Sequence, residues 1–266
     1  DGSTEIFTGR FLLDASGFGR VLPRLLHLEC PSDFPSRTSM FTHIEDNISD
    51  VQYDRNKILI TVHPQHRDVW FWLIPFSDGR CSIGVVAENT HFDSRDTRSE
   101  AALSDWVNED PTLKTLLAHA NWDMAARQIT GYSVNVKQLT GHNYALLGNA
   151  GEFLDPIFSS GVTIAMRSAS MAAGLLLRQF NGERIDWERD YQKPLLTGVD
   201  TFRAFVTAWY DGSFQDIIFH QQQSADIRKM ICSILAGYAW DTANPYVENP
   251  SRRLNALAAY CRANGT

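Results

Sequence analysis

The residues best placed for chemistry lie in one stretch, from Tyr144 to Val162, which reads YALLGNAGEFLDPIFSSGV. An apolar strand runs into a turn of small residues, and a long Ala- and Leu-rich segment begins after Ser159. A helix that starts there presents unpaired backbone N–H groups and the positive end of its dipole. Such an end favours a phosphate, a carboxylate, a halide or an electron-rich ring. The structural alternative is an ordinary strand-loop-helix connection with a glycine-rich turn.

These residues need a strand and a helix to hold them. Residues 162–180 are rich in Ala, Leu and Met, and Asn181-Gly182 follows as a stop signal, so we expect a helix that begins at residues 159–161. Residues 5–14 alternate and then become apolar, which predicts a strand entering a buried sheet.

The rest of the chain divides into a strand-rich part and a helical part. Between residues 36 and 136, short β-branched and aromatic runs predict an antiparallel sheet with one helix at 99–119. Past residue 181, amphipathic segments predict helices that cover the sheet. These helices are expected at 187–210, 214–238 and 250–262. Their aromatic side chains are typical of a core, with a pocket for a flat substrate as the alternative.

Three strings occur in a fixed order along the chain: D-A-S-G at 14–17, W-x-W-x-I-P at 70–75, and G-N-A-x-x-F-x-D-P-x-x-S-S-G at 148–161. Together they resemble segments of FAD-dependent halogenases and of related aromatic hydroxylases. The resemblance implies an α/β (α+β) fold: an incomplete Rossmann-like FAD-binding domain at 1–22 and 138–182, an inserted antiparallel β-sheet substrate domain at 23–137, and a C-terminal helical region at 183–266.

The resemblance also implies the roles of individual residues. FAD-binding residues would be Asp14, Ala15, Gly17, Gly148, Asn149, Asp155, Pro156, Ser159, Gly161 and Val162. The amides of Ser160 and Gly161 would hold chloride or bromide. From the residue type alone, Asp155 is more typical of a turn cap than of a catalytic acid.

Four residues would line the passage from flavin to substrate: Trp70, Trp72, Pro75 and Phe158. Trp70 and Trp72 lie two residues apart, so both side chains point to one face of a strand. Two core tryptophans in a sheet are the alternative. Tryptophan halogenases place Glu where Phe158 stands, so the resemblance favours a phenol or pyrrole, free or bound to a carrier protein, over free tryptophan.

Two departures from the family pattern affect the interpretation. The G-x-G-x-x-G unit that holds a dinucleotide pyrophosphate does not occur here, so we expect an N-terminal segment outside this sequence. The family's catalytic lysine would belong to that segment, and no catalytic residue is assigned. Asn149 stands where the family usually has Asp to bond a ribityl hydroxyl; Asn keeps one acceptor, so the change bears on FAD occupancy rather than on the fold.

Composition limits the class of protein. A chain of 266 residues with 44% hydrophobic residues can bury a sizeable core. The net charge of -7 with scattered Lys and Arg residues argues against nucleic acid and anionic membranes as partners. Four separated cysteines and no run of 18 apolar residues favour a cytoplasmic protein outside the membrane. The H-x-x-H string at 63–66 contains Pro and has no third ligand nearby in sequence, so no metal is expected.

The leading hypothesis is therefore a flavin-dependent halogenase that uses reduced FAD from a separate flavin reductase, oxygen and a halide on an electron-rich aromatic molecule. One alternative is a flavin-dependent hydroxylase or reductase of the same fold. The other is a binding module that kept the fold and lost the cofactor, which Asn149 and the missing glycine-rich unit motivate.

Overall fold

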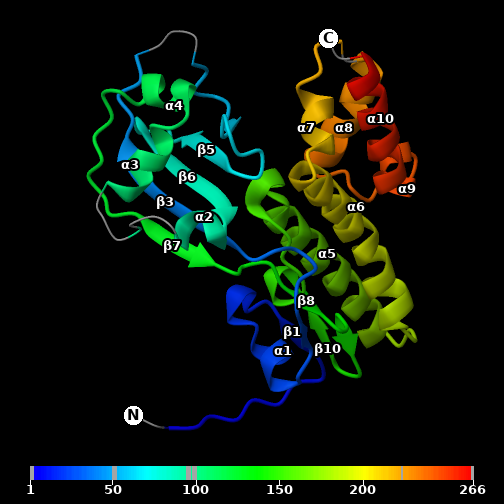
Figure 1. The fold of residues 1–266 in the computed structure, drawn as a ribbon. Coiled ribbons are helices and arrows are strands. Elements are labelled where there is room, and N and C mark those ends of the chain that lie inside the picture. Colours follow the sequence, from blue (N-terminus) through cyan, green and yellow to red (C-terminus); the bar gives the residue numbers. More distant parts are fainter. Residues whose placement is uncertain (1–2, 50–52, 94–96, 98–100, 223, 265–266) are drawn as a thin grey trace. The chain divides into compact units, whose positions relative to one another are not determined.

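The computed structural model describes residues 3–49, 53–93, 97, 101–222 and 224–264. The chain forms two compact units (Figure 1). The first consists of residues 1–34, 133–209 and 213–266, and the second of residues 35–132 and 210–212. The chain therefore leaves the first unit near residue 34 and returns to it near residue 133. The predicted helical region at 183–266 lies, apart from residues 210–212, in the same unit as the predicted FAD-binding segments.

The first unit contains a small mixed sheet. Its strands are β1 (Leu12–Asp14), β10 (Tyr144–Leu146) and β9 (Thr140–Gly141), in the order β1-β10-β9. β1 and β10 are parallel, with Asp14 opposite Leu146. Because parallel strands end at the same edge, the D-A-S-G turn and the Gly148 turn emerge side by side. A separate antiparallel pair joins β2 (Glu29–Cys30) to β8 (Asn135–Val136).

Helices make up most of the first unit. They are η1 (Gly17–Gly19), α1 (Val21–Leu25), η2 (Gly148–Ala150), η3 (Pro156–Phe158), α5 (Ser160–Phe180), the π-helical turn η4 (Glu188–Gln192), α6 (Lys193–Tyr210), α7 (Ser213–Ile218), α8 (Ala225–Leu235), α9 (Pro245–Glu248) and α10 (Pro250–Asn264). Strand formation was predicted from residue 5, but only residues 12–14 pair with a neighbour. The helix predicted over 214–238 is broken into α7 and α8.

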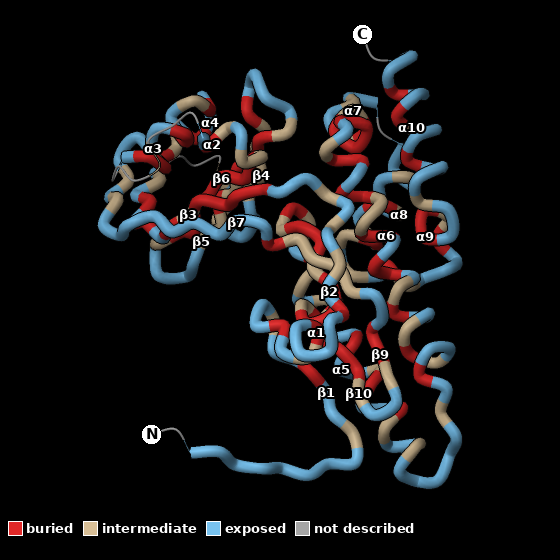
Figure 2. Tube along the Cα trace, turned by 60° about the horizontal axis from the view of Figure 1, so that its bottom comes forward, coloured by how far each residue is buried: buried red, intermediate tan, exposed pale blue. Residues whose placement is uncertain are grey.

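Buried aromatic side chains form much of this unit's core. Tyr191, Phe202, Phe205 and Phe214 are almost wholly inaccessible to solvent. Figure 2 shows buried stretches along α6 and α7. The hydroxyl of Tyr191 donates to the carbonyl of Leu146 at 2.7 Å, which ties η4 to the end of β10. The interpretation of these aromatics as core is confirmed for Phe202, Phe205, Trp209 and Phe214, whereas Phe219 is exposed.

Helix α5 is long and apolar enough to cross a membrane, the one helix among the described residues that passes this test. The core helix of a protein outside the membrane can have the same length and composition, so these two properties do not identify a membrane span. Its first turns pack against η2 and η3, while Val162, Met166 and Leu177 are exposed on another face. The absence of a membrane partner stays a prediction.

The second unit is built on an antiparallel sheet of order β4-β5-β6-β3-β7. The strands are β3 (Arg37–Glu45), β4 (Leu59–Val62), β5 (Trp70–Pro75), β6 (Arg80–Glu88) and β7 (Arg127–Thr130), and the helices are α2 (Asn89–Asp93), α3 (Ala102–Val107) and α4 (Pro111–Leu116). Phe71 and Leu73 of β5 pack with Ile83 and Val85 of β6 into an apolar core that includes Trp106. Alternation along β5 sends Trp70 and Trp72 to the other face.

Two sequence expectations are refined in this unit. The single helix expected at 99–119 is two helices, because Asp110 caps a new helix at Pro111 by accepting from the amides of Thr112 and Leu113. Part of its expected first turn, residues 99 and 100, lies outside the described residues. The strand expected at 128–136 is divided between β7 in the second unit and β8 in the first.

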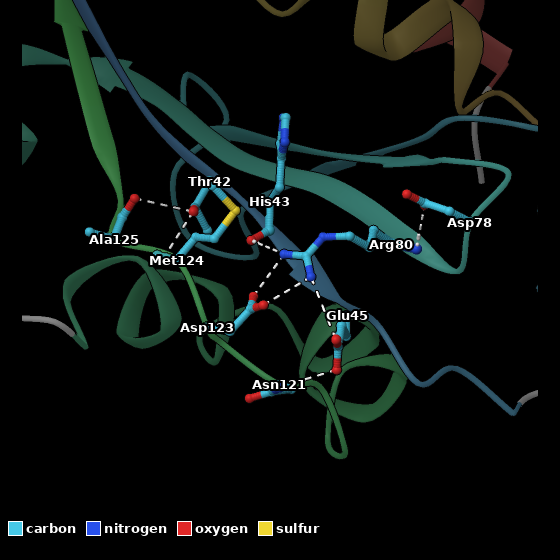
Figure 3. A network of polar contacts seen from close by, with 9 residues as sticks. All are labelled: Thr42, His43, Glu45, Asp78, Arg80, Asn121, Asp123, Met124 and Ala125. Atoms are coloured by element: carbon cyan, nitrogen blue, oxygen red, sulfur yellow. Dashed lines mark hydrogen bonds and ion pairs between the residues drawn. The ribbon is translucent and has the colours of Figure 1, made fainter.

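Arg80, the first residue of β6, links the sheet to the segment that follows α4 (Figure 3). Its guanidinium makes a two-point ion pair with Asp123, at 2.9 and 2.7 Å, and also donates to the carbonyl of His43. Thr42 donates to the carbonyls of Met124 and Ala125. The ion pair lowers the pKa of Asp123, but both side chains are open to water, so it fixes geometry more than stability.

Candidate functional site

The end of β1 is a turn organised by Asp14. Its carboxylate is buried and accepts from the amide of Ser16 at 2.8 Å and from the amide of Leu22 at 2.8 Å. These bonds close the loop that contains Ala15 and Gly17, where Gly17 has a φ of 58° that favours glycine. The carboxylate that the family resemblance places by FAD therefore shapes the turn in this structure.

The second turn, Gly148 to Gly151, is packed directly against α5. A Cβ on Gly148 would lie 2.8 Å from the Cβ of Ala165, and its φ is 49°. The amide of Gly148 donates to the hydroxyl of Ser168 at 3.0 Å. Glycine is thus required here both by the backbone conformation and by the close approach of the helix.

Arg20 joins the two turns, and sequence reasoning missed it. This buried guanidinium donates to the carbonyl of Asn149 at 3.2 Å and to that of Asn135 at 3.0 Å, and its Nε forms an ion pair with Glu29 at 3.0 Å. A buried charge is tolerated when it is paired and hydrogen-bonded in this way. Only an isolated Arg after G-F-G marked it in the sequence, and the two carbonyls that it binds lie more than a hundred residues away along the chain.

A second ion pair, with a buried carboxylate, lies beside the same turn. Glu152 accepts from the Nη2 of Arg203 on α6 at 3.0 Å. Burial raises the pKa of Glu152, and the Arg203 guanidinium opposes that shift. The pair anchors the Gly148 turn to α6, and sequence reasoning did not single out either residue.

Asp155 caps the short helix η3. Its Oδ1 accepts from the amide of Ile157 at 3.0 Å, next to Pro156, and the side chain is almost wholly buried. The capping role predicted from the Asp-Pro pair is confirmed. A direct role of Asp155 or Pro156 in holding FAD stays a prediction.

The N-terminus of α5 is the feature that could receive an anion. Ser159, the N-cap, has a left-handed φ of 51° and its side chain makes no capping hydrogen bond. The positive helix end is therefore not neutralised by its own cap. A Cβ on Gly161 would lie 3.2 Å from the Phe153 ring and 3.6 Å from the Oδ1 of Asn149, so the first turn of α5 faces the Asn149 side chain.

Ser160 and Val162 flank this position differently. Ser160 is buried, whereas Val162 on the same turn is exposed. The structure thus brings Asn149, Ser159, Ser160 and Gly161 to one place, as predicted. The glycine positions and the uncapped helix end fit the electron-rich edge of a flavin ring and a halide.

Phe158 packs edge-on within the aromatic core of the first unit. Its ring centroid lies 5.5 Å from that of Phe214, 6.1 Å from Trp209 and 6.3 Å from Phe205, with the planes nearly perpendicular. No carboxylate stands at this position, which agrees with the sequence. The role of Phe158 in a substrate passage stays a prediction.

The two tryptophans of the W-x-W-x-I-P string lie on β5 in the second unit, with ring centroids 5.8 Å apart. Trp70 is buried and donates from Nε1 to the hydroxyl of Tyr210 at 3.0 Å. Trp72 donates from Nε1 to Ser82 at 3.0 Å. Their placement on one face is confirmed, and Pro75 ends the same strand.

Residues that support the tryptophans were not found from the sequence. Arg37 places its guanidinium 3.4 Å from the centroid of the Tyr210 ring. Gly84 is paired with Trp72 on the neighbouring strand. Because glycine has no side chain, the Trp72 indole can lie over its backbone. Cross-strand pairing could have identified Gly84, but nothing in the sequence near β5 points to Tyr210, which lies 140 residues further on.

Comparison with known proteins places these features in one family. The family model described as tryptophan halogenase matches residues 3–239. A 1H-pyrrole-2-carbonyl-[peptidyl-carrier protein] chlorinase of Pseudomonas fluorescens is 26% identical over 216 residues, which cover 78% of this chain and 47% of that protein. The chain spans about half the length of the curated relatives it matches.

Two solved structures are similar to the fold. A flavoprotein/dehydrogenase from Cytophaga hutchinsonii is 40% identical with a TM-score of 0.90, covering 95% of this chain and 62% of that one. The flavin-dependent brominase Bmp2 is 24% identical with a TM-score of 0.80, covering 96% of this chain and 64% of that one. The second likeness shows the fold alone.

Proposed function

Because the chain belongs to the tryptophan halogenase family, we propose that the protein uses reduced FAD, oxygen and a halide to chlorinate or brominate an electron-rich aromatic compound. The observation that carries this proposal is the uncapped N-terminus of α5, whose Gly161 faces Asn149 beside the turn that Arg20 fixes. This surface of the first unit favours a bound anion.

Each residue of this surface has a task. FAD, when bound, would supply the redox chemistry that activates oxygen. The α5 dipole would stabilise negative charge on the ring edge, and the amides of Ser160 and Gly161 would hold the halide. Gly148 lets the backbone approach closely, while Asp14 and Arg20 keep the two turns in place.

We further propose a phenol or a pyrrole as the substrate, free or bound to a carrier protein. Phe158 offers no carboxylate to polarise the halogenating species, so an electron-rich ring is favoured. The name of the Pseudomonas relative specifies a pyrrole on a peptidyl-carrier protein, which supports the same class. A separate flavin reductase and a cytoplasmic location complete the proposal.

The test is the mass of the product. The full-length protein, supplied with reduced FAD, oxygen and bromide, is incubated with a simple phenol and with a carrier-bound pyrrole. We expect an isotopic bromine pattern that disappears when bromide is omitted. Addition of oxygen alone, independent of halide, would reject halogenation and identify a hydroxylase.

A second candidate function is flavin-dependent oxidoreduction without halogenation. The 40% identical solved structure is described as a flavoprotein/dehydrogenase, and that identity exceeds the identity to the brominase. Electron transfer between an organic substrate and FAD, seen as reduction of oxidised FAD or reoxidation of reduced FAD without oxygen, that leaves no halogen or oxygen on the substrate would identify this activity. A full-length preparation that takes up no FAD would instead support the binding-module alternative.

A further inference from the structure

Three side chains of the second unit converge on one point outside the features described above. His66 and Asp68 lie in the connection between β4 and β5, and His91 lies on α2. One candidate ligand atom of each residue, an imidazole nitrogen or a carboxylate oxygen, lies within 4.8 Å of the others. From this geometry we propose that His66, Asp68 and His91 form a binding site for a divalent transition-metal cation, with zinc as its probe.

The backbone holds two of the ligands in a fixed loop. The amide of His63 donates to the carbonyl of Val69 at 2.9 Å, and the amide of Val69 donates to the carbonyl of His66 at 3.0 Å. The loop is therefore closed on both sides of His66 and Asp68. These backbone hydrogen bonds fix the positions of His66 and Asp68 within a short loop.

The third ligand is anchored from both ends of its helix. Asn89 bonds through its side chain to Thr38 and to Ser36, at 2.9 and 3.1 Å. Phe92 is buried against Trp106. His91 sits between these anchors, so α2 presents its imidazole toward the loop, where Nε2 lies 2.8 Å from the Oδ2 of Asp68.

The neighbouring His63 is excluded as a ligand by its own hydrogen bonds. Its Nδ1 accepts from the amide of Gln65 at 3.1 Å, so Nε2 carries the proton and donates to Glu109 at 2.9 Å. The ring of His66 lies between those of His63 and His91, with centroids 4.9 and 5.0 Å away. The H-x-x-H pair is thus not the metal site; His66 would act with Asp68 and His91 instead.

The chemistry of the set suits a first-row transition metal. Two imidazoles and one carboxylate match zinc, nickel, cobalt or ferrous iron better than magnesium or calcium, which prefer oxygen ligands. A zinc ion with bonds of about 2.0–2.2 Å requires ligand atoms roughly 3.3 Å apart. His66, which is exposed, must therefore move inward, and the Asp68 to His91 contact must open slightly.

Exposure of His66 leaves room for water as the remaining ligand. The carboxylate of Asp68 gives the site a net negative charge that attracts a cation. The bound ion would clamp the β4–β5 connection to α2, directly before Trp70. Its role would be to fix the start of the strand that carries both tryptophans.

The test uses the 266-residue chain without an affinity tag, stripped of metal by a chelator that is then removed. Calorimetric titration with zinc should give one site per chain, and cobalt should give a visible d–d absorption band. His66→Ala and Asp68→Asn should each weaken zinc binding by about tenfold or more. His142→Ala, which removes an exposed imidazole of the first unit, is the matched control and should bind as the parent does.

A second readout separates metal binding from damage to the fold. Zinc should slow hydrogen exchange at residues 63–69 and 89–93 in the parent chain and in His142→Ala, but not in His66→Ala. Circular dichroism verifies that the variants are folded. Equal zinc affinity in the parent, His66→Ala and Asp68→Asn would overturn the proposal, as would the absence of stoichiometric binding in a folded parent chain.

Discussion

The indole of Trp72 covers the backbone of Gly84 on the neighbouring strand. A Cβ on Gly84 would lie 2.3 Å from the Cζ2 of Trp72, closer than any carbon contact allows. The two residues are paired in the register of β5 and β6, so neither strand can shift to make room. The position of Trp72 in the W-x-W-x-I-P string therefore depends on Gly84, which lies 12 residues later in another strand.

Gly84→Ala should consequently destabilise the second unit. The added methyl must displace Trp72 and its hydrogen bond to Ser82, and we expect a loss of about 1–3 kcal/mol in the free energy of unfolding. Urea denaturation measures the effect. Gly174→Ala is the control: no atom lies within 4 Å of its Cβ position in α5, so we expect a gain of about 0.5–1 kcal/mol. A neutral Gly84→Ala would show that the Trp72 ring is free to move.

Arg20→Met should loosen the pair of turns at the end of the first sheet. The variant leaves the carbonyls of Asn149 and Asn135 without their donor and leaves Glu29 without its buried partner. We expect a loss of about 1–3 kcal/mol in the free energy of unfolding, because two carbonyls lose a buried donor, whereas Glu29 is half-exposed and still faces Arg24. Arg24→Met removes the exposed cation that also faces Glu29, and it should cost less than about 1 kcal/mol. Similar losses in the two variants would contradict the linking role of Arg20.

Part of the fold and of the candidate site could be predicted from local sequence, and part could not. The Asp155 cap and the start of α5 depend on residues close together in the chain, so motif and helix signals located them. The parallel pairing of β1 with β10 joins segments more than a hundred residues apart. Arg20 with Asn149, and Trp70 with Tyr210, are joined over more than a hundred residues by tertiary packing. The break between α7 and α8 was missed because the Gln-rich segment before Ser224 carries neither Gly nor Pro.

Gly161→Ala should impair halide binding at the N-terminus of α5 without unfolding the protein. The methyl meets Phe153 at 3.2 Å and Asn149 at 3.6 Å, contacts that small adjustments relieve, so the fold should persist. It also occupies the space in front of the first-turn amides. We expect product formation with reduced FAD and bromide to fall by about tenfold or more, which is about 1.4 kcal/mol. Gly174→Ala should retain the parent rate, and an unchanged rate in Gly161→Ala would place the halide elsewhere.

The cysteines should differ sharply in reactivity. Burial raises the pKa of the Cys81 thiol from 9.0 to about 12, whereas Cys232 is exposed. An aromatic disulfide reagent at mildly alkaline pH should label Cys232 rapidly and leave Cys81 unmodified until the protein unfolds. Mass spectrometry of peptides identifies the labelled sites. Rapid labelling of Cys81 in the folded protein would contradict its burial.

The same pKa shift makes stability depend on pH. The unfolded chain releases the Cys81 proton near 9.0 and the folded chain only near 12, so the contribution of the protonated thiol is complete below pH 9.0. It is lost as the pH rises toward 12, and Tyr53, raised from 10.0 to about 12, acts in the same direction. Urea midpoints should therefore fall over this window. Cys81→Ala should reduce the slope, and Cys232→Ser should not.

Asn149→Asp should strengthen the α5 terminus electrostatically. The side-chain oxygen of Asn149 faces Gly161 in the first turn, and Ser159 supplies no side-chain cap, so a carboxylate there would meet an uncompensated positive dipole. We expect a gain of about 0.3–1 kcal/mol in the free energy of unfolding at low ionic strength, which shrinks in concentrated salt because screening weakens the interaction. Thermal unfolding at two salt concentrations measures both effects.

The added charge would also compete with a halide for the same helix end, so a rise in the bromide concentration needed for half-maximal product formation should accompany the gain in stability. Greater stability with an unaltered bromide requirement would mean that Asn149 and the halide occupy separate parts of this surface.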